Sequence, residues 1–351
     1  MTLPNPESHK LPAYPGFDWL RIILASVVVL VHEGMRFPGP IDGTLAVDVF
    51  FALSGWLIGG ILLKTEPAEL PRFFFNRATR IWLPYAAAIV LLYGFAAVYE
   101  GAGRPWWTYL FYDATFTHQL FARPGIDAMP LGGSGAQFWS ISVEEQFYLL
   151  APAIMLLHPA GKTLWPWLAI AAAGLGFGLL GTPIALGVIA AILHRDHGDW
   201  HLGTAGRTAV LAGTAALLAM LFMRDSMAVR AFFAIGLVLC VALPGRRGKL
   251  GLFLGAISYP LYLNHWVGAF AGNGVTKHLL HLPPDGRWTL PAFIALAYAA
   301  SLLTAAAAWW LVDRRVMIGR DSWYSPARGK ALGTAAYGLV ATGMAGGVLL
   351  R

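Results

Sequence analysis

Long apolar runs constrain the fold of this chain more than any other feature of its sequence. A helix needs ~20 predominantly apolar residues to cross a lipid bilayer, and eleven runs approach or reach that length. Because only 12% of the residues are charged, about half the share of a soluble domain, we expect an all-α, polytopic membrane helix bundle. The runs lie near 17–36, 44–63, 80–99, 138–157, 164–180, 182–194, 207–223, 229–244, 251–271, 290–312 and 332–350.

Composition excludes several other classes of protein. With 57% hydrophobic residues, the chain is neither a soluble enzyme nor a disordered segment. The net charge of +7 comes from short basic clusters between apolar runs, whereas nucleic-acid binding needs a basic face, so we expect no nucleic-acid partner. The single cysteine, Cys240, lies inside an apolar run, which indicates no disulfide framework and no paired thiol ligands. We therefore expect no metal site.

The distribution of Lys and Arg predicts the orientation in the membrane. With the N-terminus inside and alternate crossings, the cytoplasmic side holds about twice as many Lys and Arg residues as the outer side, as the positive-inside rule requires. We expect a cytoplasmic tail over 1–16, one membrane domain over 17–315, a cytoplasmic loop over 316–331 and an additional transmembrane helix over 332–351. The first run lacks a cleavage site, so it is predicted to be a retained span.

Ionisable groups at membrane depth are costly and are candidates for function. In the first span, Arg21 and His32 are eleven positions apart, roughly three helical turns, so they share one face and differ in depth by about 16 Å. Arg21 is then near the inner surface and His32 near the outer one. The alternatives are an inner anchor that snorkels for Arg21 and a helix–helix hydrogen bond for His32.

The fourth span begins with a polar cluster. Ser140, Glu144 and Tyr148 recur at four-residue spacing, so they share one helix face. This face brings the Glu144 carboxylate to about the depth of His32. A carboxylate beside an imidazole fixes its tautomer and raises its basicity, as a general base requires. We therefore predict that Glu144 orients His32, and that Glu145 faces water or a second helix. A purely structural pairing between spans is the alternative.

Two arginines lie at the inner start of the third span. Arg77 and Arg80 are three residues apart and face one way on a helix. Guanidinium groups bind phosphate groups through two parallel hydrogen bonds. We interpret the pair as a binding site for an anionic donor, and anchoring by the positive-inside rule is an equally simple explanation.

The second span contains one acidic residue and a small pair. Asp48 lies near its outer start, where the helix dipole alone would stabilise a carboxylate. Ser54 and Gly55 fall at mid-depth, where small residues let another helix or a ligand approach closely. We assign all three to substrate binding as a hypothesis.

The ninth span is interrupted by Pro260. The surrounding segment directs Tyr259, Tyr262 and His265 toward the interior or the outer half of the bundle. We include these three side chains among the candidate substrate-binding residues. Packing between helices is the simpler explanation for this segment taken alone.

Taken together, these motifs resemble the acyltransferase-3 family of integral membrane acyltransferases. The resemblance runs from about Phe17 to Arg315 and depends on four motifs in the family's order. They are Arg21 with His32 after ten intervening residues, Val47-Asp-Val-Phe-Phe51 with Ser54-Gly-Trp-Leu-Ile58, Arg77-x-x-Arg80, and Trp139-Ser-Ile-Ser-Val-Glu-Glu-Gln-Phe-Tyr148.

The resemblance implies a multi-pass bacterial inner-membrane enzyme with a ten-span core and no bound cofactor. It implies transfer of an acyl group, most often acetyl, from cytosolic acyl-CoA to a hydroxyl of an extracytoplasmic or lipid-linked glycan. It also implies catalytic importance for His32 and Arg21 and a donor-site role for Arg77 and Arg80. The chain departs from the family pattern at Trp56, where Phe is usual, at Asp313, where Glu often stands, and in the eleventh span.

The residues also allow functions of other classes. In a proton-coupled secondary transporter or exporter, intramembrane His and Glu residues relay protons, but the internal repeats typical of transporters are not evident here. A membrane sensor or scaffold is a third class, although the scattered charges offer a partner little to recognise. The sequence leaves open the acyl chain, the acceptor, a covalent intermediate and the oligomeric state.

Overall fold

The computed structural model describes residues 13–122, 129–283 and 286–350. Within these ranges every regular element is a helix and none is a strand, so the predicted all-α bundle is confirmed. Residues 1–12 of the predicted cytoplasmic tail, and residue 351, lie outside the described residues. The helices are α1 Pro15–His32, α2 Gly43–Lys64, η1 Pro67–Glu69, α3 Leu70–Tyr99, α4 Arg104–Ala114, α5 His118–Phe121, α6 Pro130–Gly133, α7 Phe138–Leu157, α8 Leu164–Phe177, α9 Thr182–His197, α10 Thr204–Met223, α11 Met227–Val241, α12 Lys249–Gly274, η3 Val275–Leu279, α13 Thr289–Ala308, η4 Trp309–Asp313, α14 Arg314–Trp323 and α15 Pro326–Leu350.

Each of the eleven predicted spans coincides with one of these helices. Within the described residues, seven helical stretches are long and apolar enough to cross a membrane, and α8 and α11 are shorter apolar helices. The outer faces of the bundle carry exposed apolar side chains, such as Val90 at 72% and Leu303 at 73% exposure. Such faces suit contact with lipid, and the chain is a multi-pass membrane protein.

Helix ends follow local sequence signals. The side chain of Asp42 caps α2 by accepting a hydrogen bond from the backbone N–H of Leu45 at 2.7 Å, and Ser226 caps α11 in the same way. Short side chains of this kind satisfy the free N–H groups of a first helical turn. Gly178 ends α8 in the left-handed conformation, which glycine adopts without steric cost.

The helices around the centre of the bundle pack closely where small residues meet. Gly55 of α2 lies directly against the backbone of Ile184 and Gly187 in α9. Gly268 of α12 faces Ser301 of α13 in the same manner. Without side chains at these positions, the backbones approach closely and gain dispersion contacts. Of the two alternatives for Gly55, a helix rather than a ligand occupies the space beside it.

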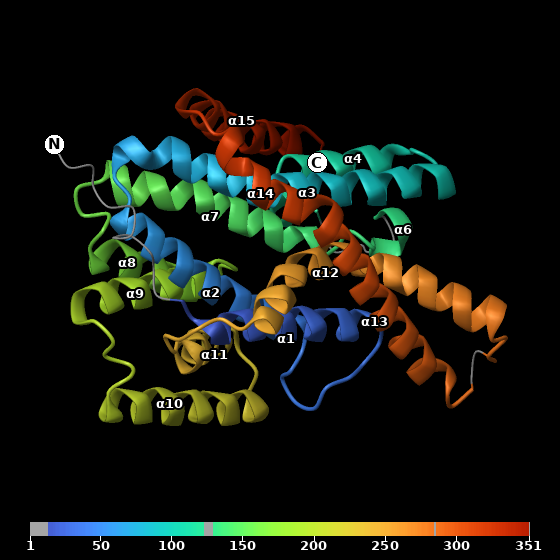
Figure 1. Cartoon of the computed structure of the whole chain (residues 1–351), viewed down its shortest axis with the longest axis horizontal. Helices are drawn as coiled ribbons and strands as arrows, with labels where there is room; N and C mark the ends of the chain where they lie inside the picture. Colours follow the sequence, from blue (N-terminus) through green and yellow to red (C-terminus); the bar gives the residue numbers. More distant parts are fainter. Residues whose placement is uncertain (1–12, 123–128, 284–285, 351) are drawn as a thin grey trace.

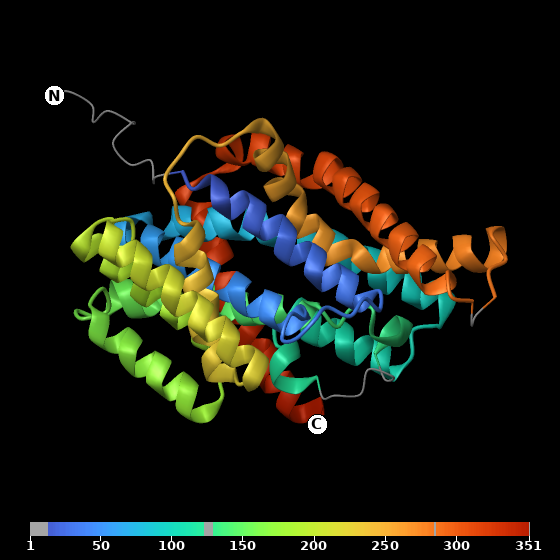
Figure 2. The same ribbon diagram turned by 90° about the horizontal axis from the view of Figure 1, so that it is seen from below.

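Two arrangements position the interior. Helix α1 lies between α12 and α2 (Figure 2), and it contacts both. Helix α15, the predicted additional span, lies along α3 (Figure 1). The hydroxyl of Tyr337 in α15 donates a hydrogen bond to the carbonyl of Leu149 in α7 at 2.8 Å. The last helix is therefore a packed part of the bundle.

The segment after α13 differs from the prediction. Much of the expected loop over 316–331 is helical, because α13, η4 and α14 form one helical stretch, Thr289–Trp323. Charged residues indicate where a helix leaves the hydrocarbon region of a membrane, but they do not terminate the helix. The helix stops shortly before Pro326, consistent with the disfavouring of helical conformation before proline. Arg72 of α3 donates a 2.5 Å hydrogen bond to Asp321 of α14, which holds this extension against the bundle.

Candidate active site

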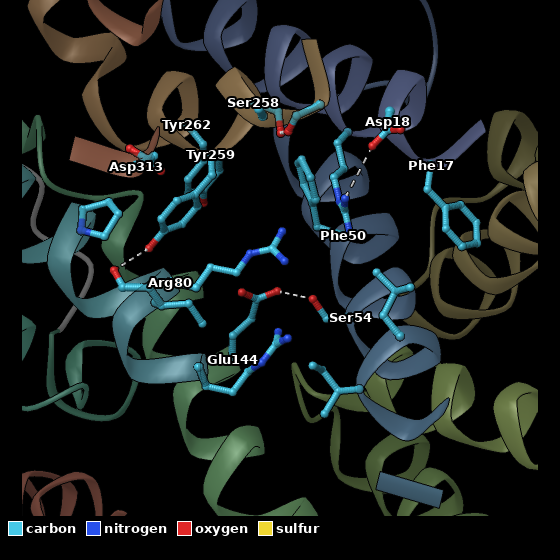
Figure 3. Close-up of a pocket in the computed structure, with 18 of the residues that line it drawn as sticks. Phe17, Asp18, Phe50, Ser54, Arg80, Glu144, Ser258, Tyr259, Tyr262 and Asp313 are labelled. Atoms are coloured by element: carbon cyan, nitrogen blue, oxygen red, sulfur yellow. Dashed lines mark hydrogen bonds and ion pairs between the residues drawn. The ribbon is translucent and has the colours of Figure 1, made fainter. Parts of the chain in front are cut away.

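A cavity of about 580 Å³ lies among α1, α2, α3, α7, α12 and the stretch from η4 to α14. Figure 3 shows the Arg80 and Glu144 side chains extending into the same space. Four guanidinium groups and three carboxyl groups line it, so the cavity is a charged pocket between apolar helices. The charged lining residues are Asp18, Arg21, Arg77, Arg80, Glu144, Arg247 and Asp313.

The three arginines proposed from the sequence all line this cavity. The Arg21 guanidinium lies 3.9 Å from the Asp18 carboxylate. The Arg77 guanidinium lies over the Tyr148 ring, with its central carbon 5.9 Å from the ring centroid. Within the described part of the chain, neither Arg77 nor Arg80 donates a hydrogen bond or pairs with a carboxylate. Their guanidinium N–H groups are therefore available to an anionic ligand.

Glu144 lies in the cavity but has a partner other than the predicted one. The Ser54 hydroxyl donates a 2.5 Å hydrogen bond to its carboxylate (Figure 3). His32 does not line the cavity and makes no hydrogen bond or ion pair with Glu144. The expected orientation of His32 by Glu144 is therefore not observed. The face of α7 that carries Glu144 turns toward α2 and α3, whereas His32 ends α1 beside α12.

The partner of His32 is a second histidine. The rings of His32 and His265 lie with their centroids 5.0 Å apart. Nδ1 of His32 is 2.9 Å from the carbonyl oxygen of Val28, and Nδ1 of His265 is 2.9 Å from that of Tyr262. A carbonyl oxygen only accepts hydrogen bonds, so in the neutral rings Nδ1 carries the hydrogen and Nε2 keeps its lone pair. Each Nε2 is thus able to accept a proton.

Two tyrosines of α12 line the cavity, and the backbone carbonyl of one of them, Tyr262, contacts His265. The Tyr262 hydroxyl lies 2.7 Å from Ser140 Oγ and donates to the carbonyl of Gln137 at 3.1 Å. The Tyr259 hydroxyl donates to the carbonyl of Ile81 at 3.4 Å. Both rings line the cavity, and His265 follows Tyr262 by three residues. The ninth-span motif therefore has one part in the cavity and one beside His32.

One ion pair in the cavity was not anticipated. The Asp18 side chain is 1% exposed and accepts two hydrogen bonds from Arg247, one of them from Nε at 2.5 Å. The hydrogen bond to Asp18 raises the pKa of Arg247. Asp18 lies three residues before Arg21, a spacing that signals interaction within a helix. Its partner, 229 residues away, has no such signal.

Three other residues singled out in the sequence lie outside the cavity. Asp48 is half-buried in α2, near Arg230, which is 3.6 Å from Asp42. Gly55 packs against α9. Glu145 is buried and accepts a 2.8 Å hydrogen bond from the indole of Trp82, so it faces a second helix, which is one of the two predicted alternatives.

Comparison with known proteins adds an independent finding. The model of a family described as an acyltransferase domain matches residues 14–310. The chain is 27% identical over 166 residues to the peptidoglycan O-acetyltransferase OatA of Listeria monocytogenes, which covers 41% of this chain and 24% of that protein. It is also 27% identical over 177 residues to the O-acetyltransferase OatA of Staphylococcus aureus. This match covers 43% of this chain and 27% of the length of that protein. The matches thus span about a quarter of the length of these curated relatives. No solved structure matches.

Proposed function

Because the chain belongs to the acyltransferase family whose model spans residues 14–310, we propose that it is a membrane O-acetyltransferase. The donor is cytosolic acyl-CoA, with acetyl as the acyl group, and the acceptor is a hydroxyl of an extracytoplasmic or lipid-linked glycan. The names of the relatives, one of which acts on peptidoglycan, support O-acetyl transfer to a cell-envelope glycan. The enzyme resides in the bacterial inner membrane with its N-terminus in the cytoplasm, an orientation supported by the excess of Lys and Arg on that side.

The observation that carries this proposal is the pair of guanidinium groups in the cavity that make no hydrogen bond or ion pair within the described part of the chain. Coenzyme A is a polyanion, and arginine binds phosphate oxygens through two parallel hydrogen bonds. Arg77 and Arg80 meet this requirement because neither is occupied by a carboxylate of the described chain. Arg21 of α1, paired loosely with Asp18, lines the same cavity and supplies a third positive charge.

The acyl group then has to reach the histidine pair. Arg21 and His32 are eleven residues apart on α1, about 16 Å at the helical rise, which the pantetheine arm of the donor spans. Tyr262 is the cavity residue of α12 nearest to His265 in sequence. We therefore place the thioester beyond Tyr262, next to the two imidazoles.

In the proposed reaction, His32 is the general base. Its Nε2 takes the proton of the acceptor hydroxyl, the oxygen attacks the thioester carbonyl, and the carbon–sulfur bond breaks. The coenzyme A thiolate leaves and receives that proton from the imidazolium, which restores the neutral base. The Val28 carbonyl, rather than Glu144, holds the required tautomer, because it accepts the Nδ1 hydrogen at 2.9 Å. His265 fixes the plane of the ring through its 5.0 Å contact. An acyl-imidazole formed on His32 is a second route to the same product.

Glu144 receives a different role in this scheme. Its carboxylate accepts a hydrogen bond from Ser54 and lies in the cavity with Arg21 and Arg77. A carboxylate at this place offsets part of the charge of the guanidinium groups when no donor is bound. It also positions Ser54 at the wall along which the donor passes.

The test is direct transfer of a labelled group. Membranes containing the protein are incubated with acetyl-CoA labelled in the acetyl group and with extracted envelope glycans, and labelled products are identified by mass spectrometry. We expect a base-labile acetyl ester on a glycan hydroxyl and release of one coenzyme A thiol per ester. Proton-coupled uptake into vesicles without thioester cleavage would instead establish a transporter.

A further inference from the structure

A second cluster of chemically active side chains lies outside the cavity, at the end of α9 and in the turn that leads to α10. His194, Asp199 and His201 meet there, with one ligand atom from each within 4.8 Å of the other two. The proposed acyl transfer uses none of these residues. The absence of paired cysteines, on which the prediction of no metal site depends, does not bear on histidine and carboxylate ligands.

The environment of His201 gives the strongest indication of a bound ligand in this cluster. Its side chain is 0% exposed, and its Nε2 lies 3.0 Å from the carbonyl oxygen of Ala242. Since the carbonyl only accepts, Nε2 carries the hydrogen and Nδ1 presents a lone pair. That Nδ1 atom is buried and has no hydrogen-bond partner in the described part of the chain. Buried polar atoms without a partner are rare in proteins because they lose their bonds to water.

The same arrangement is typical of a histidine that ligates a metal. Such a residue donates its other ring N–H to a carbonyl or carboxylate, which fixes the tautomer and the ring orientation. Ala242 follows the last residue of α11, Val241, so this contact also connects the turn to a neighbouring helix. The lone pair of His201 Nδ1 is thus available to bind a metal ion.

The other two side chains complete a ligand set. His194 Nδ1 lies 3.1 Å from the carbonyl oxygen of Gly198 and 3.6 Å from a carboxylate oxygen of Asp199, so in the neutral ring Nδ1 carries the hydrogen and Nε2 presents the lone pair. The Trp56 ring closes the site on one side, at centroid distances of 5.3 Å from His194 and 5.9 Å from His201. An apolar wall strengthens the attraction between a cation and its ligands by excluding water.

We propose that His194, Asp199 and His201 bind one divalent transition-metal ion, for which Zn²⁺ is the probe. Two imidazoles and one carboxylate form a set that such ions accept, with water as the fourth ligand. Ligands of a tetrahedral ion lie roughly 3.3 Å apart when the metal–ligand distance is about 2.0–2.1 Å. Asp199 is exposed and His194 partly so, so both side chains are able to move inward while His201 stays fixed. The ion holds the turn between α9 and α10 against α2 and the end of α11.

The experiment uses the full chain in detergent with an affinity tag that contains no histidine. Metal is removed with a chelator, Zn²⁺ is added, and bound metal is counted by mass spectrometry after gel filtration. Thermal unfolding is followed with and without Zn²⁺. We expect about one Zn²⁺ per chain and a rise of the unfolding midpoint, because a ligand that binds only the folded state stabilises it.

Variants separate this site from chance binding. Asp199→Asn keeps the shape of an exposed side chain and removes the anionic ligand, so Zn²⁺ should bind at least about tenfold more weakly. His194→Gln should behave likewise, and neither change removes a buried group. His197→Ala, which alters an exposed histidine on the same helix, is the matched control and should bind like the unaltered chain. Absence of stoichiometric Zn²⁺, or equal binding by Asp199→Asn and the control, would overturn the proposal.

Discussion

Replacing Arg80 with alanine tests how the donor is held. The guanidinium reaches into the cavity from α3 (Figure 3), and it donates no hydrogen bond to the described protein. Its removal therefore breaks no protein contact of that kind. The loss should fall on the anionic donor, and the fold should be preserved.

The magnitude follows from what the side chain offers. A hydrogen bond to a charged group contributes about 1.5–3 kcal/mol, which corresponds to a roughly 10- to 150-fold change in affinity at 1.36 kcal/mol per factor of ten. We expect the KM for acetyl-CoA to rise by about this factor in Arg80→Ala. Arg80→Lys keeps the positive charge and loses the two parallel hydrogen bonds of a guanidinium, so its KM should lie between those of the unaltered chain and Arg80→Ala.

The assay is coenzyme A release at varied acetyl-CoA and fixed glycan acceptor, with purified protein in proteoliposomes. Arg315→Ala is the matched control, because this arginine lies over the Trp310 ring and does not line the cavity. Its KM should not change. If Arg80→Ala kept the KM of the unaltered chain at an equal unfolding midpoint, the guanidinium would be a topological anchor and the donor site would lie elsewhere.

Two further variants test the packing that shapes the cavity, and both are read from the thermal unfolding midpoint in detergent. Asp18→Ala removes a 1% exposed carboxylate that accepts hydrogen bonds from Arg247, so it should destabilise the chain by about 1–3 kcal/mol. The control Asp321→Ala breaks an exposed ion pair and should destabilise the chain by at most about 1 kcal/mol. Equal unfolding midpoints of the two variants would contradict the stabilising role of the buried pair. Gly55→Ala places a methyl group against the backbone of α9 and should lower the free energy of unfolding by about 1–3 kcal/mol. In the control Gly60→Ala the added methyl group meets no atom within 4 Å, so the midpoint should not change. An unchanged midpoint for Gly55→Ala would contradict the close packing of α2 against α9.

The sequence predicts the helices well because each apolar run has one stable conformation in lipid. Every backbone polar group must be satisfied inside the segment, which leaves only the helix. The clearest difference, α14 Arg314–Trp323, has the same origin. Charge predicts where the apolar layer ends, and a helix ends only where a residue such as Pro326 interrupts it.

The site is predicted in its members and not in all of its pairs. Arg21, Arg77 and Arg80 lie together in one cavity, as their predicted inner depth indicates, whereas Glu144, which the sequence placed at the depth of His32, lies with them in that cavity. Spacing within a helix fixes which residues share a face, but the rotation of that face relative to another helix depends on packing. For this reason the sequence paired Glu144 with His32, whereas the structure pairs it with Ser54.

Contacts between distant segments were beyond the reach of sequence patterns. Arg247 meets Asp18 across 229 residues, and the positive-inside rule explains Arg247 without a partner. The spacing of His194, Asp199 and His201 was visible, with both imidazoles and the carboxylate within eight residues. The spacing does not show that His201 is buried or that it forms a hydrogen bond with the carbonyl of Ala242, because both depend on the fold.

The measurement that tests the central claim most directly is acetyl transfer by purified His32→Ala in proteoliposomes loaded with labelled acetyl-CoA and glycan acceptor. His32 lies outside the donor cavity, so donor binding should persist while transfer falls by about 10²–10⁴-fold, the usual contribution of a general base. His32→Gln, which keeps a hydrogen-bonding side chain but offers no proton acceptor of imidazole basicity, should be equally inactive. Transfer by His32→Ala at the rate of the unaltered chain would contradict the account.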